Sequence, residues 1–76
     1  MIRHAVYALA EEHKSAVAGY FDRLLTEAGY RDHAELAQQF VLLLDGSMVT
    51  ALRVRSAEPG LRARAIAATL LAAATT

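Results

Sequence analysis

The chain has 76 residues, 55% of them hydrophobic, with no cysteine and a formal net charge of zero. This composition excludes a disordered tail, disulfides and thiolate metal sites, and it gives no overall attraction to nucleic acid. A chain this short buries only about 60% of its unfolded surface, and it usually needs a disulfide, a metal or a partner subunit to be stable.

The apolar runs are too short for a membrane segment. The longest are Ala5–Ala10, Phe40–Leu44 and Leu70–Ala74, and none approaches the ~18 residues of a membrane span. The N-terminus has no small-residue cleavage site before Glu11 and Glu12, so we expect no secretory signal. The sequence therefore predicts a cytoplasmic protein without a membrane segment.

A first helix is predicted over residues 4–28. Its apolar residues recur every three or four positions and form one stripe, which comprises Val6, Leu9, Ala10, Val17, Tyr20, Phe21, Leu24 and Ala28. Gly29 follows the last apolar turn and suits the C′ position, because glycine adopts at little cost the left-handed conformation that ends many helices.

Three residues of this first helix are candidate ligand-binding residues: His13, Val17 and Tyr20. The imidazole and the phenol place polar atoms beside apolar surface, a combination found in pockets for small molecules. The same combination is found at the edge of an ordinary helical core. The residues alone leave both interpretations open.

The second predicted helix, residues 33–54, is apolar almost all the way round. Asp32 and Glu35 match a capping box at its start. Two apolar stripes follow, one of Leu36, Phe40, Leu43, Ser47 and Ala51, the other of Ala37, Val41, Leu44, Met48 and Leu52. Leu42 and Val49 occupy the side that a surface helix keeps polar. Such a helix needs packing partners on two sides, and so short a chain supplies too few, so we expect an assembly.

The centre of this helix holds the unusual run Asp45, Gly46 and Ser47. A glycine inside a helix costs about 1 kcal/mol relative to alanine. A buried carboxylate is costly unless it is paired. We interpret the run as a close helix crossing at an interface, with Asp45 held by an arginine or a backbone donor. The alternative is that Asp45 simply reaches solvent.

A third helix is predicted over residues 57–73. Ser56 is its expected N-cap, and Pro59 falls in the first turn, where a missing N–H is harmless. Its apolar surface consists mostly of alanine, with Leu61, Ala65, Ile66, Ala68, Thr69, Leu70, Ala72 and Ala73. Small side chains let two helices approach closely.

Four arginines lie at or near the predicted turn before the third helix: Arg53, Arg55, Arg62 and Arg64. They could form a basic patch for phosphates, but so few contacts provide little affinity. We favour the interpretation of a solvated helix–turn–helix corner.

Catalytic and metal-binding motifs are absent. No HExxH, P-loop, GxGxxG or GxSxG sequence occurs, and no glutamate stands three residues before a histidine, as helix-bundle di-iron sites require. We therefore expect no enzymatic activity, no metal and no cofactor.

A family resemblance rests on AELAQQ at 34–39, LLLDG at 42–46, the residues 49–52 and the Ala- and Arg-rich segment 62–71, with EHK at 12–14 and LLTEAG at 24–29 upstream. In this order the segments resemble the C-terminal regulatory domain of TetR-family transcriptional repressors. The resemblance implies an all-α domain over residues 1–76, in which the second and third helices pair with those of a twofold mate as a four-helix bundle.

The resemblance also implies roles for particular residues. The dimer interface would comprise Phe40, Leu43, Leu44, Ser47, Ala51, Ala65, Ala68, Thr69 and Ala72. His13, Val17 and Tyr20 would face part of a pocket for a small apolar effector. Members of the family begin with a helix-turn-helix DNA-binding domain, which residues 1–76 lack. The chain is then either a fragment or a natural truncation, and DNA binding would belong to the missing N-terminal domain.

Two other functions stay open on the sequence. One is a free-standing dimeric interaction module that does not bind DNA, and the other is a helical bundle that binds a small molecule with no DNA link. The sequence also leaves open whether the first helix packs on its own subunit or on the partner.

Overall fold

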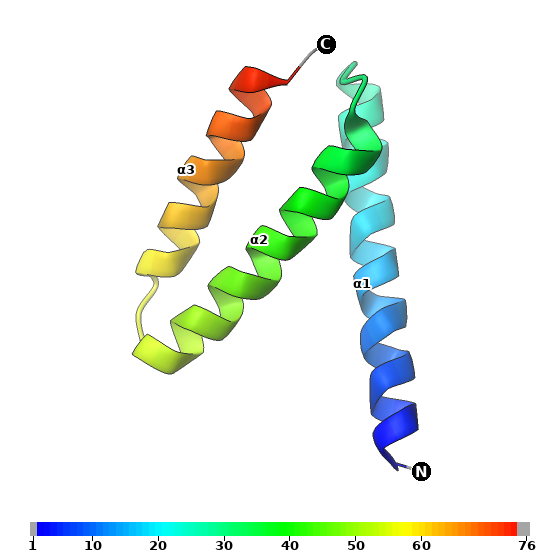
Figure 1. The fold of residues 1–76 in the computed structure, drawn as a ribbon, viewed down its shortest axis with the longest axis vertical. Coiled ribbons are helices and arrows are strands. Elements are labelled where there is room, and N and C mark those ends of the chain that lie inside the picture. The colour runs from blue at the N-terminus through cyan, green and yellow to red at the C-terminus, as the bar shows by residue number, and fades with distance from the viewer. Residues whose placement is uncertain (1, 75–76) are drawn as a thin grey trace.

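Three helices account for almost all of the described chain (Figure 1). α1 spans Ile2–Glu27, α2 spans His33–Val54 and α3 spans Glu58–Ala73. The computed structural model describes residues 2–74, without the side chains of residues 2–4, 7 and 10, and this range contains no strand. The all-α class predicted from the sequence is confirmed, and each helix begins and ends within two residues of its predicted bounds.

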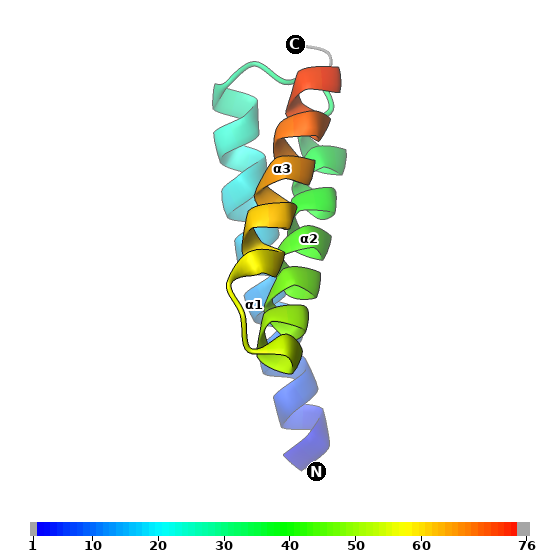
Figure 2. The same ribbon diagram turned by 90° about the vertical axis from the view of Figure 1, so that its left-hand side faces the viewer.

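The helices form one open layer with α2 in the middle (Figures 1 and 2). α1 and α3 both run antiparallel to α2, and within the described residues no Cα atom of α1 comes within 8 Å of a Cα atom of α3. The layer measures 44 × 28 × 13 Å, and its radius of gyration is 14.1 Å. A compact chain of this length would have a radius of gyration of about 11 Å. The fold is therefore flat and only partly closed.

The core is small and lies where the end of α1 packs on the start of α2. Leu25, Leu36 and Ala37 are buried together there. Partly buried side chains surround them, namely Phe21, Tyr30, Phe40, Leu70, Leu71 and Ala74. Towards its N-terminus α1 diverges from α2 (Figure 1). As a result Leu9 of α1 and Leu52 of α2 stay 66% and 80% exposed.

Gly29 is the left-handed residue that follows the end of α1, as predicted. Its φ is +90°, and its N–H donates to the carbonyl of Thr26 at 3.0 Å, while the N–H of Tyr30 donates to the carbonyl of Leu25 at 3.1 Å. These two bonds define a Schellman motif. Tyr30 then packs on the core cluster that contains Leu25, which is the hydrophobic contact that usually accompanies this motif.

The capping box predicted at Asp32 and Glu35 is wrong. The Asp32 side chain makes no capping hydrogen bond, and its backbone, at φ −88° and ψ 33°, lies outside the extended region that directs an N-cap side chain toward free N–H groups. The start of α2 is fastened to α1 instead. Nδ1 of His33 lies 2.5 Å from Oδ1 of Asp22. Because a carboxylate only accepts, Nδ1 carries the proton of this hydrogen bond.

The turn between α2 and α3 depends on Arg55 and Ser56. Arg55 ends α2 in the left-handed region at φ 53° without being a glycine, and the N–H of Ser56 donates to the carbonyl of Ala51 at 3.2 Å. The Ser56 hydroxyl accepts from the N–H of Glu58 at 3.1 Å. The predicted N-cap, Ser56, is therefore wrong by one residue: α3 begins at Glu58 and its N-cap is Ala57, which makes no side-chain capping bond, while Pro59 lies buried in the first turn.

Candidate interaction surface

Two sides of α2 are used inside the chain. Leu43 and Ser47 lie beside Ala63 of α3, where the three residues line hollows on both faces of the α2–α3 contact. Ala37 lies on the side of α1, with Ala18 and Gly19 nearby. The predicted stripe that contains Ala37 faces α1, and the stripe that contains Leu43 and Ser47 faces α3, although Leu36 and Phe40 of this second stripe also pack against α1. Only the first half of the α1-facing stripe is buried, because α1 diverges from the second half.

A third side of α2 stays largely exposed, although its edges line hollows shared with Lys14 of α1 and with residues of α3. Leu42 and Val49 lie on it and are 74% and 65% exposed, and their spacing of seven residues keeps them on one face with Gly46. A Cβ atom added to Gly46 would meet no atom within 4 Å.

A hollow of about 240 Å³ adjoins this open face between α2 and α3. Leu42, Gly46 and Thr50 line it from α2, and Pro59, Arg62 and Ile66 line it from α3. The sequence does not mark Ile66 as a neighbour of Gly46. No local pattern could have done so, because the pairing depends on how α2 and α3 cross.

The interface residues implied by the resemblance fall into two groups. Those of α2 lie between helices of the same chain: Phe40, Leu43, Leu44 and Ser47 line a hollow of about 330 Å³ with Phe21 of α1 and part of α3, and Ala51 is half-buried. Those of α3 lie on its exposed side, namely Ala65, Ala68, Thr69 and Ala72. Whether the two groups meet across a dimer stays a prediction.

The polar side chains in this set are already hydrogen-bonded. The Ser47 hydroxyl donates to the carbonyl of Leu44 at 3.0 Å, and the Thr69 hydroxyl donates to the carbonyl of Ala65 at 3.1 Å. Covering either residue with a partner would leave no unpaired donor, so neither hydroxyl opposes burial.

Asp45 is paired, though not as expected. Its Oδ2 lies 3.7 Å from Nζ of Lys14, and both side chains are about half exposed. The expected arginine or backbone donor is therefore replaced by a lysine of α1. An exposed pair of this kind contributes little stability, but it places the middle of α1 beside the middle of α2.

The candidate ligand residues lie along one side of α1. His13 is exposed, Val17 is half-buried, and Tyr20 is 54% exposed with its ring 6.2 Å from that of Phe21. Within one chain they form a strip of surface that is not enclosed by other helices. Their ligand-binding role stays a prediction.

The basic residues do not gather into one patch in α3. Arg62 lines the hollow beside Leu42, whereas Arg64 lines the hollow beside Phe40, on the other face of the layer. This separation agrees with the interpretation of a solvated corner.

Among the residues and side chains that the structure describes, no three His, Asp or Glu are grouped to bind a metal ion, and no helix is both long and apolar enough to cross a bilayer. Comparison with models of protein families, with curated proteins and with solved structures finds no match to this chain. A function for the chain therefore has to be inferred from its own surface.

Proposed function

We propose that this chain is a non-catalytic dimerisation module that pairs with a second copy through the uncovered sides of α2 and α3. The observation that carries the proposal is the exposure of large apolar side chains on both helices. Leu42, Val49 and Ile66 are 74%, 65% and 49% exposed, and Leu42 and Ile66 line the same hollow. Single exposed apolar residues are common, but contiguous apolar surface on adjacent helices is typical of an interaction site.

The total surface area supports the same conclusion. The chain has an accessible surface of 6027 Å² for a mass of 8.2 kDa. A compact monomer of this mass exposes about 4,500 Å², so about 1,500 Å² is in excess. A stable interface buries about 800 Å² on each partner. One twofold interface therefore accounts for a large part of the excess.

Within this proposal, the chain is the dimerisation and partial ligand-binding portion of a TetR-like transcriptional regulator that acts in the cytoplasm. The resemblance of residues 34–46 and 62–71 supports this assignment, as does the antiparallel arrangement of α2 and α3. A four-helix bundle between two copies would consist of two such pairs. His13, Val17 and Tyr20 would face an effector whose pocket is completed by preceding helices, and DNA contacts would belong to an N-terminal domain.

A free-standing dimeric module is the second candidate. It is favoured by the fact that the open sides of α2 and α3 need only a second copy to be covered. The coding region upstream of Met1 separates the two candidates. An in-frame helix-turn-helix supports the regulator, whereas an in-frame stop codon supports the free-standing module.

Sedimentation velocity across a dilution series that reaches the micromolar range tests dimerisation. We expect a dimer that dissociates only on strong dilution. Leu42→Arg should yield a folded monomer because it places a charge on the open side of α2. Leu9→Arg is the matched control, since Leu9 is 66% exposed on the diverging part of α1. A wild-type chain that is a folded monomer at micromolar concentration would overturn the proposal.

A further inference from the structure

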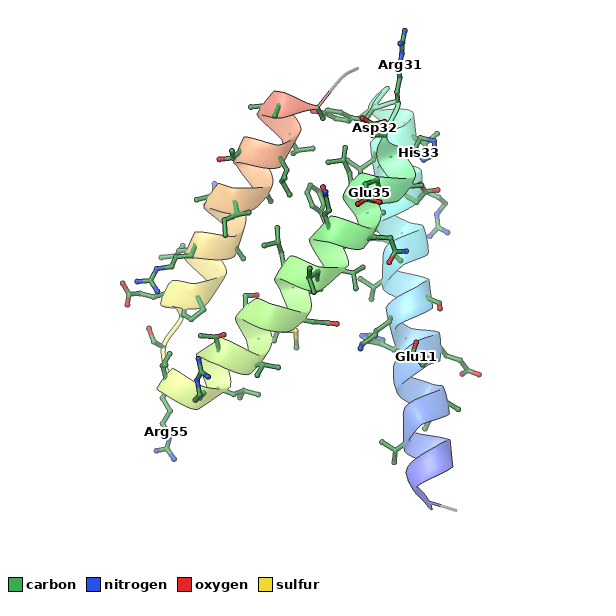
Figure 3. All side chains as sticks on the ribbon, in the orientation of Figure 1. Glu11, Arg31, Asp32, His33, Glu35 and Arg55 are labelled. Atoms are coloured by element: carbon green, nitrogen blue, oxygen red, sulfur yellow. The ribbon has the colours of Figure 1, made fainter. Side chains whose placement is uncertain are left out.

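The open side of α2 carries a regular pattern of residues. At alternating intervals of four and three, it presents Glu35, Gln39, Leu42, Gly46, Val49 and Arg53, which we call the α2 seam. This spacing is the a/d repeat that coiled coils use to keep one seam facing a partner helix. All six residues are exposed except Gln39, which is half-buried. Figure 3 shows Glu35 on the near side of α2.

The α2 seam is complementary to itself. If a second α2 lies antiparallel across a twofold axis near residue 44, Glu35 faces the partner's Arg53, Gln39 faces the partner's Val49, and Leu42 faces the partner's Gly46. The same three contacts recur by symmetry, as an isologous interface requires. We propose that two copies of this chain pair through their α2 seams in this antiparallel register, an inference that rests on the dimerisation proposed above.

Charge at the two ends of the seam selects the antiparallel orientation. Glu35 lies in the first turn of α2 and Arg53 in the last, about 27 Å apart along the helix. Neither residue has an ion-pair partner within the part of the chain that the structure describes. A parallel pairing would place Glu35 against Glu35 and Arg53 against Arg53. The antiparallel pairing instead forms two opposite-charge contacts.

Gly46 supplies the space at the centre of the seam. A glycine weakens a helix, and apart from its neighbours in α2 no atom lies within 4 Å of the position where the Cβ of residue 46 would be. In the proposed register the partner's Leu42 lies over Gly46, beside the hollow lined by Leu42, Gly46 and Ile66. A leucine side chain packs into such a space, and the symmetric contact uses the same two residues again.

Charge reversal tests the register. In Glu35→Arg and in Arg53→Glu, both end contacts of the homodimer become repulsive, and we expect self-association of each variant to weaken by about tenfold. A mixture of the two variants restores opposite charges at both ends. We expect native mass spectrometry of the mixture to show mainly the heterodimer, with an affinity near that of the wild type.

A matched pair of variants controls for net charge. Glu12→Arg and Arg23→Glu change the net charge in the same way on exposed positions of α1, so their mixture should contain homodimers and heterodimers in statistical proportion. Helix stability needs a separate control, because Glu35 and Arg53 also complement the α2 macrodipole and their reversal lowers helix stability. That loss stays within each chain and is not relieved by mixing, so far-UV circular dichroism separates it from the contact between chains.

The possible outcomes separate the register from dimerisation. Homodimers of both seam variants that are weaker than the wild-type dimer, together with preferential heterodimers in the seam mixture alone, support the antiparallel register, because a parallel wild type would already be repulsive at both ends. A wild-type dimer whose seam variants show no such preference overturns the register and leaves dimerisation standing. A monomeric wild type overturns both proposals.

Discussion

The rings of Phe21 and Phe40 pack edge to face, with centroids 5.6 Å apart and ring planes at 88°. Phe21 belongs to α1 and Phe40 to α2, and both rings pack against the core cluster. Edge-to-face geometry brings the positive edge of one ring to the negative face of the other. The contact therefore holds α1 on α2 next to the core.

The first prediction concerns this aromatic pair. Phe21→Leu and Phe40→Leu should each destabilise the fold, and a double-mutant cycle should show a coupling energy of about 0.5–1.5 kcal/mol. Urea denaturation of the two single variants and the double variant measures it. Leu52→Ala in the same background is the control, because Leu52 lies near the other end of α2 and is 80% exposed. Full additivity of Phe21→Leu and Phe40→Leu would contradict a direct ring–ring contribution.

The second prediction concerns the turn after α1. Gly29 has a φ of +90°, where an L side chain is strained, so Gly29→Ala should lower the free energy of unfolding by about 1–2 kcal/mol. Gly19→Ala should raise it by up to about 1 kcal/mol, because a Cβ there meets no atom within 4 Å and alanine favours the helix. Thermal denaturation of both variants checks the opposite signs. If both substitutions changed the free energy of unfolding in the same direction, backbone conformation would not be the cause of the effects.

The third prediction separates folding from assembly at Gly46. Gly46→Ala should stabilise the helical state of α2 in the monomer by about 1 kcal/mol. No other helix lies close enough to oppose a methyl group there. The dimer should nevertheless dissociate more readily, because the partner's Leu42 loses its space. Sedimentation equilibrium measures the dissociation constant. Gly19→Ala is the control, and it should stabilise α1 without changing that constant.

The fourth prediction concerns the contact between His33 and Asp22. His33→Ala removes the hydrogen bond that fastens the start of α2 to α1, and it should cost about 1 kcal/mol. His13→Ala, at an exposed position of α1, should cost much less. Urea denaturation at one fixed pH compares the two. Equal losses would show that the Nδ1–Oδ1 contact contributes nothing specific.

The fifth prediction concerns ligand binding at α1. If His13, Val17 and Tyr20 wall part of an effector site, some small apolar compounds should raise the melting temperature of the chain. His13→Ala and Tyr20→Ala should abolish those shifts, whereas Glu27→Ala, at an exposed position near the end of α1, should retain them. Shifts that survive both site substitutions would place the compounds elsewhere.

The local structure of this protein could be predicted from its amino-acid sequence. The spacing of apolar residues predicted the three helices, Gly29 predicted the left-handed end of α1, and the apolar residues all round α2 predicted that part of it would lack cover within one chain. These features depend on residues within a few positions of one another, so a pattern along the chain contains them.

Only the packing of the helices decides which of their sides are covered. Ser47 lies at the contact with α3, Leu42 and Gly46 stay open, and His33 fastens the start of α2 where a capping box had been predicted. Each of these outcomes depends on the angle at which two helices cross. That angle results from how many side chains of both helices fit together at once, and no single stretch of sequence contains it.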